Sequence, residues 1–268
     1  MTRDARIGAG FLATLAVLAI AGPLIAPDPR AQPDLINGLL LPPSAQHWFG
    51  TDQLSRDVFA RFAHGARVSL LVAVVAVSVA GALGTAIGLA AGGSRGVLAE
   101  MFRRVIDIGL ALPRVVVLLV LLAASGVLPV PLFAVLLGAT GWPTIARLVR
   151  GEALRLQQMA FVSAARALGA TPGRVLVREL FPGTLPAVLV ASTLGVADAV
   201  LLEAGLSFLG LGVRPPWPSW GGMLLDARDH LATAPWLLLA PAVALVVATA
   251  GATLLGESLR RFLQPDTP

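Results

Sequence analysis

Six apolar runs of about the length needed to cross a lipid bilayer constrain this chain more than any other feature of its sequence. A helix rises about 1.5 Å per residue, so about 20 apolar residues cover the roughly 30 Å of hydrocarbon in a membrane. The third run is interrupted by Pro113-Arg114. The pattern predicts an all-α membrane protein with about six transmembrane helices. The expected spans are residues 7–26, 68–91, 105–126, 131–146 with a start near residue 128, 183–204 and 232–256.

The composition supports a membrane location and excludes several other classes of protein. Of the 268 residues, 56% are hydrophobic and only 13% are charged, whereas a soluble domain carries roughly 25% charged residues. All twenty basic residues are arginines, spread along loops without interleaved aromatic residues, which argues against nucleic-acid binding. The chain has no cysteine, so disulfides and thiol-ligated metal sites are excluded. His47, His64 and His230 lack ligand spacing, so no metal site or catalytic constellation is predicted.

The first apolar run has a competing interpretation, a signal peptide that is cleaved off. Arg3 and Arg6 precede the run, and Ala19-Ile-Ala21 resembles a small-residue cleavage site. The run is long for a signal peptide and more spans follow it, so its retention as a span is expected.

The chain divides into two parts. Residues 1–67 are expected to form an N-terminal span and a polar extracytoplasmic connector, and residues 68–268 the core transmembrane domain. In the connector, Thr51 is placed as the N-cap of an interfacial amphipathic helix. That helix is predicted from the spacing of Leu54, Val58, Arg61 and Phe62.

The distribution of arginines predicts the orientation. An even number of spans puts both termini on one side, and a cytoplasmic side with the most arginines fits the positive-inside rule. Arg56, Arg61 and Arg67 go against the rule, and the neighbouring Asp52 and Asp57 offset them in part. The inside set has thirteen members, Arg3, Arg6, Arg95, Arg103, Arg104, Arg147, Arg150, Arg155, Arg166, Arg174, Arg178, Arg260 and Arg261. The outside set has six, Arg30, Arg56, Arg61, Arg67, Arg214 and Arg228, with Arg114 left inside a span.

Residues 147–182 form a polar, arginine-rich interruption between the fourth and fifth spans. A short helix is predicted there, followed by Gly169 as its left-handed end. Thr171-Pro172 then reads as an N-cap and the first residue of a second helix. One face of the first helix is apolar at helical spacing, and the other is polar. The apolar face consists of Phe161, Ala164, Ala165 and Leu168, and the other carries Ser163 and Arg166.

A small apolar face held just outside a bilayer is suited to dock into a groove of another protein. The alternative is an ordinary amphipathic helix that rests on lipid headgroups. Ser163-Ala-Ala-x-x-x-Gly169, followed after nine residues by Glu179-Leu-Phe-Pro182, resembles the EAA loop of bacterial ABC-importer permeases. The family usually has a glutamate where this chain has Ser163, so the carboxylate of the family motif is missing here.

That resemblance implies a cytoplasmic coupling helix that sits on an ATP-binding subunit. A bulky charged residue at Ala164 or Ala165 is then expected to break coupling. The residues implied in coupling are Phe161, Ser163, Ala164, Ala165, Arg166, Leu168 and Gly169.

Two more segments resemble the dipeptide, oligopeptide and nickel branch of the same family. They are Phe49-Gly-Thr-Asp-Gln-Leu-Ser-Arg-Asp57 and Glu203-Ala-Gly-Leu-Ser-Phe-Leu-Gly-Leu-Gly212, the second followed by a Pro-x-Trp-Gly pattern. The resemblance implies the type I ABC importer fold, the C-type permease subunit and a place in the bacterial inner membrane with both termini in the cytoplasm. It also implies a second, homologous permease subunit, two ATP-binding subunits and an extracytoplasmic substrate-binding protein. Peptides are the expected cargo, with nickel or glutathione as alternatives.

This chain cannot itself hold ATP in a P-loop, because that motif needs a lysine and the chain has none. No cofactor is expected on the chain, and ATP and Mg²⁺ are assigned to partner subunits. The chain is therefore predicted not to be catalytic.

Charged residues inside spans are costly and need an explanation. Asp107 is expected to pair with Arg103 and Arg104, whereas no partner for Arg114 is evident. Asp198 and Glu203 lie in the fifth span, where lining a translocation pathway and pairing between helices are both open.

Two structural expectations concern glycine and tryptophan. Gly81, Gly84 and Gly88 in the second span are placed at spacings that favour close helix contact. Residues 206–222 are too rich in Pro and Gly for a regular helix, and Trp217 and Trp220 suit a membrane interface.

Two other classes of function stay open at this level. A secondary transporter driven by an ion gradient would show inverted repeats and discontinuous helices around midplane charges, and no clear repeat is visible. A structural membrane protein without a transport role would leave the predicted docking helix unexplained.

Overall fold

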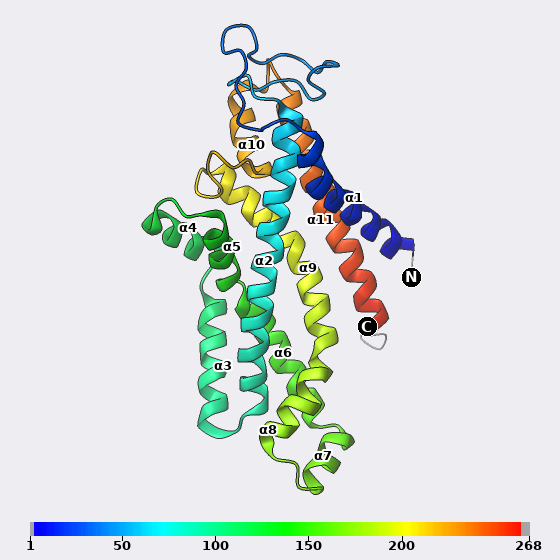
Figure 1. The fold of residues 1–268 in the computed structure, drawn as a ribbon. Coiled ribbons are helices and arrows are strands. Elements are labelled where there is room, and N and C mark those ends of the chain that lie inside the picture. The colour runs from blue at the N-terminus through cyan, green and yellow to red at the C-terminus, as the bar shows by residue number, and fades with distance from the viewer. Residues whose placement is uncertain (1–2, 264–268) are drawn as a thin grey trace.

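The computed structural model describes residues 3–263, and within that range the structure is helical, with a single isolated bridge between Thr51 and Asp57 as its β pairing (Figure 1). The α-helices are α1 Arg3–Ile25, α2 Val58–Gly93, α3 Gly96–Ala111, α4 Arg114–Ser125, α5 Val130–Ala139, α6 Trp142–Gln157, α7 Ala160–Ala167, α8 Pro172–Val175, α9 Phe181–Phe208, α10 Trp220–Ala227 and α11 Trp236–Leu263. A π-helical turn, η1 Leu176–Leu180, joins α8 to α9, and a 3₁₀ turn, η2 Arg228–His230, follows α10.

The number of spans agrees with the prediction. Four helical segments are long and apolar enough to cross a membrane on their own, and there are up to six spans if each of two bent helix pairs counts as one. The pair α3 and α4 is bent by 80°, and the pair α5 and α6 by 42°. The third predicted span is therefore a sharp corner and not a straight helix. Pro113 stands at this corner, where its ring removes the backbone N–H that a continuous helix would need.

Helix α2 is the centre of the bundle and packs against α1, α5, α6 and α9. Its glycines allow the close approach that the sequence predicted. A Cβ atom on Gly84 would lie 2.7 Å from Cβ of Ile145, and one on Gly88 would lie 2.6 Å from the carbonyl oxygen of Ala146. Both contacts are on α6, so α2 and α6 touch nearly backbone to backbone. Gly81 faces α9 with more room, since its nearest neighbour would be Ser192 at 3.5 Å.

The molecule has two distinct ends (Figure 1). The connector between α1 and α2 lies at one end together with α10, and α7 and α8 lie at the opposite end. Helices α1 and α11 pack along each other, and Arg261 lies 3.6 Å from Asp4. The start of the first span and the end of the last are therefore on the same side, as an even number of spans requires.

The prediction that an interfacial helix begins after Thr51 is wrong, because the helix begins at Val58. Thr51 does not cap a helix, because its hydroxyl donates to the carbonyl of Gly38 at 2.6 Å and accepts the N–H of Leu41 at 2.8 Å. The cap is Asp57, whose carboxylate accepts the N–H of Ala60 at 2.7 Å. Val58, Arg61 and Phe62 are thus the first turns of α2 itself.

Candidate functional site

Helix α7 projects from the end of the bundle opposite the connector (Figure 1). Its predicted apolar face is largely uncovered. Phe161 is 47% exposed, Leu168 is 89% exposed, and Ala164 between them is exposed as well. Ala165 is half-buried, so it lies at the edge of this face. Large apolar side chains at the tip of a projecting helix are typical of a surface that a partner covers.

The opposite side of α7 fastens the helix to the rest of the chain, and this anchor was not predicted. Val162 is fully buried among side chains of α6, α8 and η1, including Leu156 and Val175. Arg166 donates a hydrogen bond to Gln157 Oε1 at 2.8 Å, and Gln157 in turn donates to the carbonyl of Gly92. Motion of α7 is therefore tied to the ends of α6 and α2. The signal that could have revealed Val162 is its i+3 spacing to Ala165 on the inner edge of the helix.

The turn after α7 has the geometry that the sequence predicted. Gly169 has a φ of +83°, the left-handed conformation that glycine adopts without steric cost. Thr171 then accepts the N–H of Arg174 at 3.3 Å, and Pro172 is the first residue of α8. Ser163 is exposed, and it is a serine where the ABC-importer permeases that this loop resembles usually have a glutamate. The local geometry is confirmed, and a role in coupling stays a prediction.

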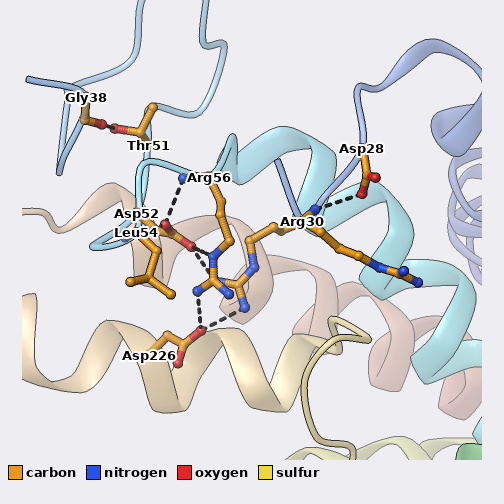
Figure 2. Close-up of polar contacts among 9 residues, drawn as sticks. Asp28, Arg30, Gly38, Thr51, Asp52, Leu54, Arg56 and Asp226 are labelled. Atoms are coloured by element: carbon orange, nitrogen blue, oxygen red, sulfur yellow. Dashed lines mark hydrogen bonds and ion pairs between the residues drawn. The ribbon is translucent and has the colours of Figure 1, made fainter. Parts of the chain in front are cut away.

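The opposite end of the molecule is held by a compact ion-pair network (Figure 2). Asp52 in the connector accepts Nε of Arg56 at 2.7 Å and Nη1 of Arg61 at 2.5 Å. Asp226 on α10 receives the same two arginines, at 3.3 Å from Arg56 and 2.7 Å from Arg61. Two of the three arginines that violate the positive-inside rule are therefore neutralised within the chain. The network joins the connector, α2 and α10.

Three of the four charges predicted inside spans have ion-pair partners, namely Asp107, Arg114 and Asp198. Arg103 pairs with Asp107 at 2.8 Å, which confirms the expected pairing of Asp107. Arg114, for which no partner was evident, pairs with Asp198 at 2.5 Å and donates to the carbonyl of Leu137 at 2.9 Å. This contact ties α4, directly after its sharp corner, to α5 and α9. The side chain of Asp198 is still 62% exposed.

Glu203 lies inside the helical bundle and has no exposed surface. Its two carboxylate oxygens accept the hydroxyls of Ser69 at 2.9 Å and Ser207 at 2.7 Å. The Ser69 oxygen also accepts the backbone N–H of Trp220 at 3.2 Å. The group joins α2, α9 and α10, so its contacts are those of a packing residue, and a pathway role for Glu203 stays a prediction.

The two tryptophans between α9 and α11 have different surroundings. Trp217 is 52% exposed and lies in the irregular segment 209–219, as expected of an interfacial side chain. Trp220 has no exposed surface, and its Nε1 donates to the carbonyl of Phe62 at 3.3 Å. The prediction of Trp220 as an interfacial anchor is wrong, because it is the first residue of α10 and packs against α2.

Comparison with known proteins adds to this geometry. A family model described as "Binding-protein-dependent transport system inner membrane component" matches residues 84–267. A dipeptide transport system permease protein of Alkalihalophilus pseudofirmus is 36% identical over 97% of this chain and 84% of its own length. A putative peptide permease protein of Brucella suis is 42% identical over 98% of this chain and 87% of its own length. A glutathione transport system permease protein of Escherichia coli is 37% identical over 95% of this chain and 84% of its own length.

Proposed function

Because the chain belongs to the family of binding-protein-dependent transport system inner membrane components, we propose that it forms half of the translocation pathway of an ATP-driven peptide importer. The observation that carries this proposal is the uncovered apolar face of α7, on a helix fastened to two spans. The names of the dipeptide and peptide permeases among its relatives support peptides as cargo. The relatives also include a glutathione permease, so the proposed cargo extends to short peptide-like compounds.

The proposed energy source lies outside this chain. With no lysine for a P-loop, the chain leaves ATP and Mg²⁺ to partner ATP-binding subunits. These subunits would cover Phe161, Ala164 and Leu168 from the cytoplasm. A homologous permease subunit would complete the pathway, and an extracytoplasmic binding protein would deliver the peptide at the end formed by the connector.

The proposed mechanism follows from the way α7 is attached. Closure of the ATP-binding subunits would displace α7, and the Arg166–Gln157 link would carry that displacement to α6 and to the end of α2 at Gly92. The close α2–α6 contact makes these two helices move together. The spans then switch between inward-facing and outward-facing packings, whose populations the nucleotide biases.

We assign Asp198 a place on the pathway side of α9, because it keeps most of its side chain exposed after pairing with Arg114. Both termini are placed in the cytoplasm, on the same side as α7. This orientation follows the arginine distribution and the pairing of the first and last helices.

Reconstitution tests the proposed function. The chain is co-expressed with its partner permease and ATP-binding subunits, and uptake of a labelled dipeptide into proteoliposomes is measured with binding protein and ATP. ATP-dependent uptake is expected, and Ala164→Arg is expected to abolish both uptake and co-purification of the ATP-binding subunits. Uptake that needs an ion gradient and no ATP-binding subunit would instead establish a secondary transporter.

A further inference from the structure

The end of the molecule that carries the connector contains a cavity of about 630 Å³. The charged residues of its walls come from four separate parts of the chain. The connector supplies Arg30, α2 supplies Arg61, the irregular segment 209–219 supplies Arg214, and α10 supplies Asp226. Cavities that bind small ligands have volumes of about 300–1,000 Å³, so this one has the size of such a site.

Two of the cavity's arginines are fully neutralised. Arg56 and Arg61 share Asp52 and Asp226, and all four ion-pair distances are between 2.5 and 3.3 Å. Both guanidinium groups are nearly buried, with side chains 12% and 8% exposed. These charges stabilise the cavity wall and leave no excess positive charge.

The other two arginines of the cavity lie outside the ion-pair network, and the carboxylate of Asp28 accepts the backbone N–H of Arg30 at 2.9 Å but not its guanidinium group. Within residues 3–263, neither Arg30 nor Arg214 has a carboxylate within ion-pair distance, and both are exposed. Figure 2 shows the side chain of Arg30 extending away from the Asp226 cluster. Its guanidinium lies 4.7 Å from the ring centre of Trp217, a contact that orients the group without neutralising it.

Arg214 lies between two cavities. It lines the cavity of about 630 Å³ and, together with Trp217, a second cavity of about 600 Å³ that is also lined by Arg67. The segment 214–217 thus separates two cavities that are each lined by arginines. Apart from Arg214 the segment is apolar, since it consists of Pro215, Pro216 and Trp217.

We propose that this cavity binds the C-terminal carboxylate of a short peptide through Arg30 and Arg214. A carboxylate is the anion that guanidinium groups bind with paired hydrogen bonds, and it is common to peptides of any sequence. The prolines, Trp217 and Leu54 provide apolar walls that accept varied side chains. The inference rests on the proposed function, because it assigns a site to the cargo of that importer.

The test uses the assembled complex of both permease subunits and the ATP-binding subunits, without binding protein. Binding of di-alanine and of its C-terminal amide is measured by saturation-transfer NMR titration. Di-alanine is expected to bind, and the amide to bind at least about tenfold more weakly, because it lacks the negative charge and the second acceptor oxygen that paired hydrogen bonds to a guanidinium group require. Arg214→Gln and Arg30→Gln are each expected to weaken di-alanine binding about tenfold.

A matched control is Arg228→Gln, since Arg228 is exposed at the same end but already paired with Asp229 at 3.1 Å. This variant is expected to bind di-alanine like the wild type. Equal binding of peptide and amide, or unchanged binding in Arg214→Gln, would overturn the inference. So would a result in which no peptide binds and Arg214→Gln weakens only the docking of the binding protein, because the arginines would then recognise a protein side chain.

The phosphate of a lipid headgroup is the other anion that could bind Arg30 and Arg214. Di-alanine is expected to bind equally in detergent and in phosphatidylglycerol nanodiscs, and loss of binding in the nanodiscs would assign the arginines to lipid headgroups. Uptake and co-purification are measured on the same preparations. Intact ATP-driven uptake without carboxylate-dependent binding overturns this inference alone, whereas loss of the ATP-binding subunits from the wild-type complex overturns the proposed function.

Discussion

The ion-pair network at the connector end and the apolar face of α7 at the opposite end differ in whether their contacts lie within the chain. At the connector end, Arg56 and Arg61 are nearly buried and each contacts two carboxylates of the same chain. At the opposite end, α7 exposes Phe161 and Leu168 and holds to the bundle by Val162 and one arginine–glutamine hydrogen bond. The charges of the ion-pair network are paired within the chain, whereas the apolar face of α7 is open to the partner that the proposed function assigns to it. Substitutions should therefore change stability at one end and assembly at the other.

The largest expected effect is on stability at the connector end. Arg61→Leu leaves Asp52 and Asp226 with one shared arginine, and breaking a buried ion pair costs about 3–5 kcal/mol. A large fall in the melting temperature of the purified subunit is expected. Arg228→Gln removes an exposed pair, which contributes about 0–1 kcal/mol, and serves as the control. Equal melting temperatures for both variants would contradict the claim that the ion-pair network stabilises the connector end.

The next effect concerns assembly at the α7 end. Leu168→Asp puts a charge into the proposed docking face, where a central apolar contact is worth about 2 kcal/mol or more. The melting temperature of the isolated subunit is expected to stay unchanged, because Leu168 is 89% exposed. Co-purification of the ATP-binding subunits is expected to fall about thirtyfold. Ile36→Asp is the matched control, since Ile36 is 86% exposed at the connector end, and its complex should assemble normally.

A smaller effect is expected from the anchor of α7. Val162→Ala removes two buried methyl groups and should cost about 1–2 kcal/mol locally. The docking face is untouched, so the ATP-binding subunits should still co-purify, while ATP-driven uptake falls several-fold because looser packing leaves the Arg166–Gln157 hydrogen bond as the main link from α7 to α6. Val177→Ala, at a position 61% exposed in η1, should leave uptake unchanged. If uptake per ATP hydrolysed were the same in both variants, the attachment of α7 would not carry coupling.

The smallest effect is a pH dependence in the connector. The backbone N–H groups of Asn37 and Ile36 donate to Asp34 at 2.9 Å and hold the pKa of that carboxyl below its usual value. A lowered pKa means that the contribution to stability is present above about pH 4 and is lost as the pH falls through the lowered pKa. Hydrogen exchange of the amides of residues 36 and 37 should be slightly faster in Asp34→Asn than in wild type at pH 7. The ratio of the two rates should approach one in acid, and a constant ratio across this range would contradict the assignment.

Local features of the fold could be predicted from the sequence because they depend on residues close together in the chain. The apolar runs gave the spans, and Gly169 and Thr171 gave the turn after α7. The exposed apolar face of α7 followed from helical spacing alone. These features use hydrophobic period, capping and glycine conformation, each of which acts over a few residues.

Features that depend on distant residues could not be predicted in this way. Arg114 pairs with Asp198, which is 84 residues later in the chain, and Glu203 accepts a hydrogen bond from Ser69, 134 residues earlier. Asp226 is 165 residues from Arg61, so the sequence could show the arginines that break the positive-inside rule without showing what neutralises them. The 80° corner at Pro113 depends on packing as well, because a proline fixes the break in a helix but not the angle of the next one.

The most direct test of the central claim is the accessibility of α7 to a thiol reagent. The chain has no cysteine, so Leu168→Cys and Ile36→Cys each introduce a single reactive site on this chain, and mass spectrometry reads its labelling by a maleimide. Both should react rapidly in the isolated subunit. In the complex with the ATP-binding subunits, we predict that Leu168→Cys is labelled at least about tenfold more slowly while Ile36→Cys is unchanged. Equal labelling of Leu168→Cys with and without the ATP-binding subunits would contradict the account.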